Sequence, residues 1–263
     1  MSVAGSRYRW LLLLAVGNAC SFDPQGYGPG PSGADAGLAD AAVTEPPDAG
    51  SDAAVVVPFC DGSDPTLVAC YRFEDPGDPL LDESSYLNDG TATNVDSLDG
   101  PPGHGLAIGF RSNSTTGIAD DVSLDVSAIT LEMWVRPASL PSSRFGLLDN
   151  NGQYGLFLAP DGKVRCSMSS TTSIALGLPV NAWSHIACSY DGSVIRMYQD
   201  GELRDMTTTS VQLGQGNPDG MCLGMNSPSG DVLDGAIDDV RVWNVARSAP
   251  AICRAADRDD CAP

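Results

Sequence analysis

The sequence predicts an all-β fold, a sandwich of two antiparallel sheets, which follows a signal peptide and a disordered tether. After residue 60, apolar residues alternate over short runs of about five to nine residues and show no sustained helical period. Turn dipeptides that suit tight hairpins separate these runs: Asn151-Gly152, Asp161-Gly162, Asp191-Gly192 and Asp200-Gly201. Short strands joined at such intervals are typical of an antiparallel sandwich.

Residues 1–19 have the features of a secretory signal peptide. Two arginines precede the apolar run 10–16, and Gly17 and Ala19 form a small-x-small cleavage site before Cys20. The run is too short to span a bilayer, which needs about 20 apolar residues. We therefore expect the protein to be exported.

The same cleavage site resembles a bacterial lipoprotein signal, although Gly17 stands where a Leu is usual. The resemblance implies a lipid on Cys20 and a protein held at the outer membrane or cell surface. Ordinary cleavage would instead release a secreted protein.

Residues 20–58 consist mainly of Ala, Asp, Gly and Pro, and 21–57 contain no Lys or Arg. Such a segment cannot bury enough apolar surface to offset the entropy lost on ordering, so we expect it to be disordered. As a flexible tether its ends would lie on the order of 35 Å apart. The folded domain is then predicted at 59–263.

The formal net charge is −20, and Lys163 is the single lysine. This balance argues against nucleic acid as a partner and against docking on anionic lipid. We expect contact with a membrane only through a lipid anchor on Cys20.

The chain has eight cysteines, and those other than Cys20 match no zinc-binding pattern. The cysteines of an exported protein meet oxidising conditions, so we interpret them as forming disulfides. We expect Cys60–Cys70 and Cys253–Cys261 to close the two ends of the domain, and Cys222 to be left over.

The clearest strand is predicted at 129–137, ended by its proline. The residues on one of its faces are apolar: Ile129, Leu131, Met133 and Val135. Those on the other face are Thr130, Glu132, Trp134 and Arg136. The last strand is predicted at 236–244, with apolar contacts from Ile237, Val240, Val242 and Trp243, and Trp183 is also expected in the core.

Residues 185–206 predict two consecutive hairpins. Folding at Asp191-Gly192 places Cys188 opposite Ile195 within one apolar face, and a one-residue slip would exchange the faces. Folding at 200–201 mismatches polar and apolar residues further from the turn, so we expect a bulge or a different loop there.

The strand at 164–168 alternates in the same way, with Val164, Cys166 and Met168 pointing inward. Cys166 and Cys188 therefore lie on one buried face, which we interpret as that of neighbouring strands. A disulfide between them would close a loop of about 20 residues and contribute ~3 kcal/mol.

Seven motifs follow one another in an order that resembles the laminin-G-like, concanavalin-A-like jelly-roll superfamily of bacterial surface proteins. The resemblance covers about residues 66 to 250. It implies two curved sheets stacked face to face, in a superfamily whose members bind sugars, glycosaminoglycans or proteins. The motifs are Cys70–Phe73, Asp82–Ser85, Gly105–Phe110, Ile129–Val135, Trp183–Ala187, Tyr198–Gly201 and Gly235–Asn244.

A sugar-binding surface needs an aromatic platform and polar groups that fix orientation. The predicted polar face supplies this mixture with Glu132, Trp134, Arg136, His185, Arg196 and Tyr198. The alternative is that a loop covers Trp134 and that His185 only bridges strands. The expected partner is a glycan or an extracellular protein, the latter held by rim loops such as 217–230.

Some relatives in the superfamily carry calcium near the rim, and calcium prefers carboxylate and carbonyl oxygens. Asp82 and Asn88 after the first strand could meet Asp238 or Asp239 of the last strand to bind Ca²⁺. The alternative is that they are ordinary turn and edge-strand residues.

A glycoside hydrolase of the same fold is the rival class. Such enzymes need two suitably spaced carboxylates, yet the same-face neighbours of Glu132 are Thr130, Trp134 and Arg136. No G-x-S-x-G motif accompanies either histidine, His104 or His185. The sequence therefore predicts a binding module without catalytic chemistry.

Overall fold

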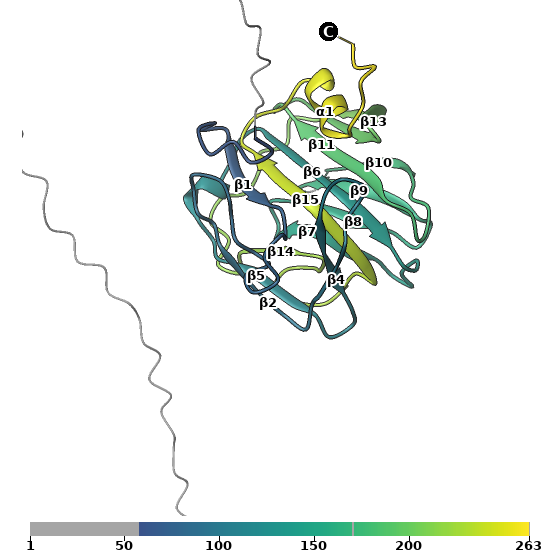
Figure 1. Ribbon diagram of the computed structural model, residues 1–263. Coiled ribbons are helices and arrows are strands. Elements are labelled where there is room, and N and C mark those ends of the chain that lie inside the picture. The colour runs from purple at the N-terminus through teal and green to yellow at the C-terminus, as the bar shows by residue number, and fades with distance from the viewer. Residues whose placement is uncertain (1–57, 170, 263) are drawn as a thin grey trace, which may run out of the picture. The chain divides into compact units, whose positions relative to one another are not determined.

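The computed structural model describes residues 58–169 and 171–262, which form a sandwich of two antiparallel sheets with a short helix near the C-terminal end (Figure 1). The predicted fold class is confirmed. The predicted signal peptide, Cys20 and the tether up to residue 57 lie outside the described residues. No helix within the described part of the chain is long and apolar enough to span a bilayer.

The larger sheet has eight strands, and β1 (Leu67–Tyr71) pairs with the second half of its central strand β15. The other seven follow the order β13 (Glu202–Thr208), β12 (Val194–Gln199), β11 (Ser184–Tyr190), β6 (Ile129–Pro137), β15 (Gly235–Trp243), β4 (Leu106–Phe110) and β3 (Asp96–Asp99).

The smaller sheet has seven strands. Outside both sheets, a 3-10 turn at Val122–Leu124 precedes β6 of the larger sheet in the chain. The strand order of the smaller sheet is β10 (Thr171–Gly177), β9 (Lys163–Met168), β8 (Tyr154–Leu158), β7 (Phe145–Asn150), β14 (Met221–Leu223), β5 (Thr115–Ile118) and β2 (Gly90–Thr93).

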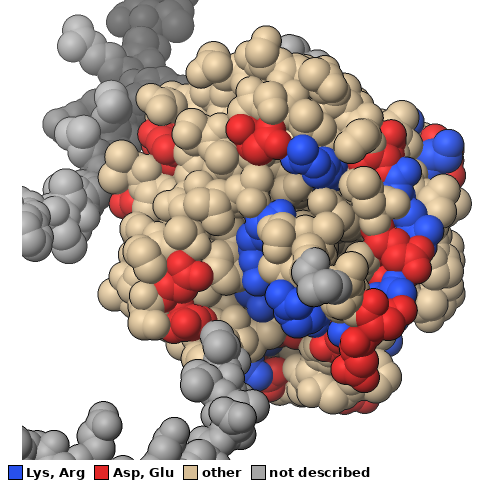
Figure 2. Space-filling view, turned by 90° about the horizontal axis from the view of Figure 1, so that it is seen from above, with Lys and Arg blue, Asp and Glu red and all other residues tan. Residues whose placement is uncertain are grey.

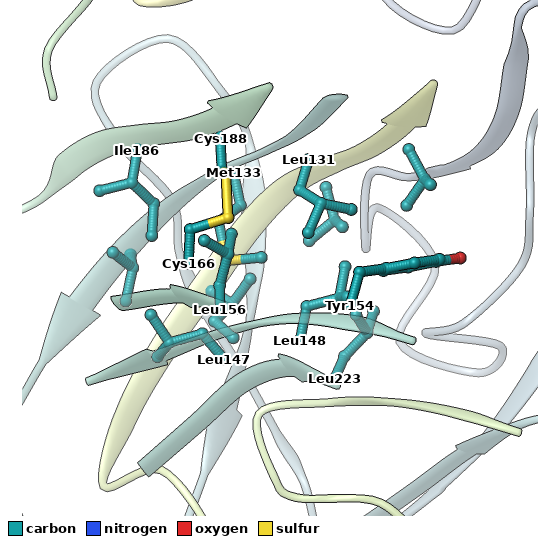
Figure 3. Close-up of a cluster of buried hydrophobic side chains, with 14 of the residues drawn as sticks. Leu131, Met133, Leu147, Leu148, Tyr154, Leu156, Cys166, Ile186, Cys188 and Leu223 are labelled. Carbon is teal, nitrogen blue, oxygen red and sulfur yellow. A yellow bond between two sulfur atoms is a disulfide. The ribbon is translucent and has the colours of Figure 1, made fainter. Parts of the chain in front are cut away.

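The core lies between the sheets, and Figure 3 shows part of it. The predicted inward face of β6 is confirmed, because all four of its apolar side chains are fully buried. On β15, Ile237, Val240 and Val242 belong to the same core, while Trp243 packs in a smaller cluster with Leu67 and Cys70.

The disulfide between Cys166 and Cys188 is confirmed, with Cα atoms 6.2 Å apart. The interpretation as neighbouring strands is wrong, because β9 belongs to the smaller sheet and β11 to the larger one. The bond therefore crosses the core and ties the sheets together (Figure 3). Strand alternation identifies the buried face of a strand but not the sheet to which that strand belongs.

The remaining cysteine predictions are also confirmed. Cys60 pairs with Cys70 of β1 at the start of the domain. Cys253 of the helix near the C-terminal end pairs with Cys261. Cys222 on β14 is free and buried.

Each of the four predicted turn dipeptides lies in a connection between paired strands. The register of β11 and β12 differs from the prediction, because Cys188 pairs with Met197 and not with Ile195. The Asp191 carboxylate accepts from the backbone N–H groups of Ser193 and Val194 and stabilises a longer loop. The shift is two residues, so the buried faces are unchanged.

The hairpin between β12 and β13 turns at Asp200 and Gly201, whose φ angles of 50° and 75° are those a two-residue hairpin loop requires. The predicted bulge is confirmed as a register shift between Met197 and Tyr198.

The helix α1 (Ala249–Ala255) was not predicted, since seven residues are too few to show a helical period. Ser248 caps its N-terminus by accepting from the N–H of Ala251. Ile252 of the helix packs on Ala187 and Tyr198, so α1 covers part of the outer side of the larger sheet.

Candidate functional site

The predicted polar face lies on the outer side of the larger sheet, on β6, β11 and β12. Three of its members are buried there and cannot serve as surface contacts, because Glu132, His185 and Tyr198 have exposed fractions of 0%, 1% and 2%. For these three the surface-contact prediction is wrong. Trp134, Arg136 and Arg196 are half-buried.

Glu132 is the centre of a buried ionic cluster. One of its carboxylate oxygens, Oε1, lies 2.8 Å from Nε of Arg241 and accepts hydrogen bonds from Arg247 and Trp243. Burial opposes ionisation of this carboxyl, but the two guanidinium groups outweigh it and lower the pKa of Glu132. Glu132 therefore fixes the positions of two arginines.

Trp134 is enclosed by two imidazole rings, with its ring centroid 5.3 Å from that of His104 and 5.4 Å from that of His185. The loop that carries His104 therefore covers Trp134, as the alternative interpretation expected. Burial lowers the pKa of His185 to about 4, so its imidazole is neutral near pH 7.

The other half-buried members have structural partners. The Arg136 guanidinium lies 4.8 Å from the ring centroid of Trp183. Trp183 is half-buried, so its predicted place in the core is wrong. Arg196 pairs with Asp191 at 2.7 Å.

The predicted calcium ligands Asp82 and Asn88 both have protein partners. Both carboxylate oxygens of Asp82 already accept hydrogen bonds, from the N–H groups of Cys70, Ser84 and Asn88 and from the Ser84 hydroxyl. The Asn88 side chain donates to the carbonyl of Val68 and to a serine hydroxyl. These residues close the loop after β1.

Asp238 and Asp239 lie at a bulge in β15, where Asp239 has a φ of 50°. The Oδ1 atom of Asp238 accepts from the N–H of Asp239, and the Oδ2 atom of Asp239 lies 2.5 Å from Nδ1 of His104. Across the described residues, no three His, Cys, Asp or Glu side chains are grouped to hold a metal ion. Calcium binding stays a prediction.

A polar recess of about 160 Å³ lies on the outer side of the smaller sheet. Its lining includes Arg144, Asp149, Asn151, Gln153, Phe157 and Asn226. Sequence reasoning missed this set, although the polar run at 149–153 is visible and the loop 217–230, singled out there, supplies Asn226. What the sequence does not reveal is that this loop crosses the outer side of β7 and β8.

The loop reaches the recess because glycine leaves room for it. A Cβ atom on Gly146 of β7 would lie 2.2 Å from the backbone carbon of Met225. Asp149 then holds the loop, because its Oδ2 atom accepts from the N–H of Ser227 at 2.9 Å. Burial raises the pKa of the Asp149 carboxyl.

The recess offers several kinds of contact. The Arg144 guanidinium lies 4.6 Å from the ring centroid of Phe157 and binds Asp231. The Gln153 amide donates to Asp125, while its buried Oε1 atom has no hydrogen-bond partner among the described residues. A carboxyl group, amide groups and an aromatic side chain thus line one small hollow.

Comparison with known proteins places the chain in a wider group. Residues 111–253 match the family model described as the concanavalin A-like lectin/glucanases superfamily. A search of curated proteins gave no significant match.

Several solved structures share the fold. Domain 4 of AbnA, an extracellular GH43 arabinanase from Geobacillus stearothermophilus solved in complex with arabinotriose, is 22% identical, with a TM-score of 0.59 over 73% of this chain and 98% of that one. The binding domain of Paraclostridial Mosquitocidal Protein 1 is 17% identical, with a TM-score of 0.60 over 73% of this chain and 52% of that one.

Botulinum neurotoxin type C, whose cell entry depends on interaction with two ganglioside molecules, is 10% identical, with a TM-score of 0.59 over 73% of this chain and 51% of that one. The chain thus spans about half the length of the two toxin structures. At these identities the likeness establishes the fold alone.

Proposed function

Because the chain belongs to the concanavalin A-like lectin/glucanases superfamily, we propose that it is a non-catalytic module that binds a glycan in the recess of the smaller sheet. The observation that carries this proposal is the grouping of the Asp149 carboxyl group with the amide side chains of Asn151, Gln153 and Asn226 around the recess. Sugar hydroxyls are the donors that such acceptors bind.

The amides of Asn151 and Asn226 add hydrogen-bonding groups at the edge of the hollow, and Phe157 adds apolar surface. This combination favours an uncharged saccharide unit.

A glycan array with the intact exported chain tests the proposal. We expect retention of a defined saccharide and loss of about tenfold in affinity, equivalent to ~1.4 kcal/mol, for Asp149→Asn or Gln153→Ala. Asp161→Asn, an exposed turn residue on the same sheet, is the matched control. Unchanged retention by both recess variants would refute this site.

Calcium provides a second readout on the same array. Because the Asp82 oxygens are already hydrogen-bonded, we expect glycan retention to be the same with and without a chelator. Retention that requires calcium would contradict the assignment.

The absence of catalysis belongs to the proposal. Glu132, the single carboxylate of the predicted face, is held between two arginines and is not free to act as an acid or a nucleophile. Incubation with polysaccharides should release no new reducing ends. Release that disappears in Asp149→Asn would instead identify a glycoside hydrolase.

A protein partner is the alternative, favoured by apolar side chains at one edge of the sandwich. Ile174 and Leu176 on β10 and Leu203 and Met206 on β13 are exposed, and the Asp205 carboxylate of β13 accepts from the N–H of Ile174. Exposed apolar patches of this kind mark interaction sites. An array without retained glycans would shift the proposal to protein-protein adhesion.

We further propose export and lipid anchoring at Cys20, with secretion as the alternative. The support is the signal-like sequence 1–19. Radiolabelled palmitate should label the wild type and not Cys20→Ala. A soluble, unlabelled wild type in the medium would favour secretion.

A further inference from the structure

A second cavity of about 350 Å³ lies beside the helix α1, where the end of β15 meets the loop that carries His104. Its lining includes Phe59, His104, Arg241, Arg247, Arg254 and Asp257, and we call it the arginine pocket. Figure 2, which views the molecule from above, shows several basic side chains close together on this face, with acidic side chains interspersed on one side. We propose that the arginine pocket binds the carboxylate or sulfate group of an acidic saccharide.

The charge balance of the pocket differs from that of the whole chain. The chain carries a net charge of −20. Around the pocket, however, Arg241 and Arg247 share the single carboxylate of Glu132, and Arg254 forms no ion pair with any residue that the structure describes. Before His104 and its two partners are counted, one carboxylate therefore balances three guanidinium groups.

His104 does not reverse this balance. Its two ring nitrogens each lie 2.5 Å from a carboxylate oxygen, one of Asp239 and one of Asp257. Counting a protonated imidazole, four cationic groups then meet three carboxylates. Burial alone would lower the pKa of His104, but the two carboxylates outweigh burial and raise it. With its imidazole protonated, the pocket retains one positive charge that a single anionic group would neutralise.

The arginines are held before any ligand arrives. The Arg241 guanidinium lies 3.9 Å from the ring centroid of Phe59, and that of Arg247 lies 4.2 Å from the ring centroid of Trp243. Both are also fixed by Glu132 from below. A guanidinium has five N–H donors, so each retains donors beyond those used by Glu132. Fixed donors of this kind bind carboxylate and sulfate oxygens without a large ordering cost.

A small acidic ligand fits better than a polyanion. The surrounding negative charge repels an extended chain of anionic groups, whereas one group inside the pocket meets only the local arginines. The Phe59 ring and the Ala251 methyl group supply apolar lining for the body of a sugar. The saccharide part of this inference rests on the proposed function, while the anion site rests on the pocket itself.

The test measures binding to the intact chain by titration calorimetry with galacturonic acid, a sulfated disaccharide, neutral galactose and inorganic sulfate. We expect the two acidic saccharides to bind and galactose to bind at least about tenfold more weakly in this pocket. Higher ionic strength should weaken acidic binding because salt screens the charges. Inorganic sulfate that binds as tightly as the sulfated disaccharide would overturn the saccharide part.

Two variants locate the site. Arg247→Gln removes one of the two guanidinium groups that share the Glu132 carboxylate. Arg254→Gln alters an exposed helix residue, and this change leaves the buried cluster intact. Each should weaken acidic binding by about tenfold. Arg165→Gln, an exposed arginine on the smaller sheet paired with Asp161, is the matched control and should change it by less than about twofold.

Thermal unfolding of each variant separates loss of the site from loss of the fold. Asp149→Asn in the recess should leave acidic binding unchanged, so failure of the arginine pocket and failure of the proposed glycan site give different results. Full acidic binding by folded Arg247→Gln and Arg254→Gln would overturn the proposal.

Discussion

Glu132 was predicted as a ligand contact and instead organises the buried charges of the larger sheet. Its position on the polar face of β6 is as predicted, but its exposed fraction is 0%. Alternation within a strand identified the face correctly. It could not show that α1 and the residues after β15 cover that face, because those contacts join positions more than 100 residues apart in the sequence.

Replacing Glu132 by Gln should destabilise the domain strongly. The change leaves two buried or half-buried guanidinium groups without their shared counter-charge, which costs about 3–5 kcal/mol for a buried pair. Urea unfolding at pH 7 measures the effect. Glu202→Gln, which removes a carboxylate exposed to solvent beside Arg204 and Arg258, is the control and should leave the midpoint unchanged.

Asp238 makes the stability of the domain depend on pH. Burial first, and then the neighbouring Asp239, raise the pKa of Asp238 to about 8, while an unfolded chain restores a value of about 3.9. The folded state thus holds a proton that the unfolded state releases. The free energy of unfolding should therefore fall as pH rises from about 4 to about 8.

Asp238→Asn removes this dependence and keeps the shape of the side chain. The variant should gain stability relative to the wild type as pH increases, measured as the difference in urea midpoints at pH 4.5 and pH 9. Parallel pH profiles for the two proteins would contradict the assignment.

At the scale of elements, strands were predicted more successfully than their partners. The strand at 129–137 has the predicted bounds, and the bulge after the 200–201 turn is where the pattern required it. The register of β11 and β12 was wrong by two residues, because a side chain lengthens the loop between them. The recess was not predicted, since it depends on contacts between the loop 217–230 and the strand β7.

The helix α1 should depend on one side chain. Ile252 is fully buried against β11 and β12, and truncation of a buried Ile to Ala costs about 2–5 kcal/mol. In Ile252→Ala we expect faster hydrogen exchange across 249–262 and weaker acidic binding in the arginine pocket. Val245→Ala, at a partly exposed position outside the helix, should change neither. Equal protection in both variants would show that the helix docks by other contacts.

For the whole molecule, the sandwich is joined at its centre by covalent and apolar contacts together. The disulfide Cys166–Cys188 joins a strand of the smaller sheet to a strand of the larger sheet. The fold class follows from alternation and turn spacing, which are local properties. The allocation of each strand to a sheet is not local, and this is why the pairing of the cysteines was foreseen while its geometry was not.

Removing this bridge should cost more stability than removing the one near the C-terminus. The loops span 22 and 8 residues, and the entropy model assigns ~3 kcal/mol to a loop near 20 residues and less to a shorter one. Urea midpoints of Cys166→Ala/Cys188→Ala and Cys253→Ala/Cys261→Ala test this. A larger loss for the second pair would contradict the expected order.

The free Cys222 gives the smaller sheet a built-in reporter. Its thiol is 2% exposed, and burial raises its pKa, so an alkylating reagent can reach a reactive thiolate only when β14 separates from its neighbours. The rate at which mass spectrometry detects the labelled peptide therefore follows the opening of that strand. The loop just beyond β14 lines the recess, so a saccharide bound there should slow the labelling of Cys222.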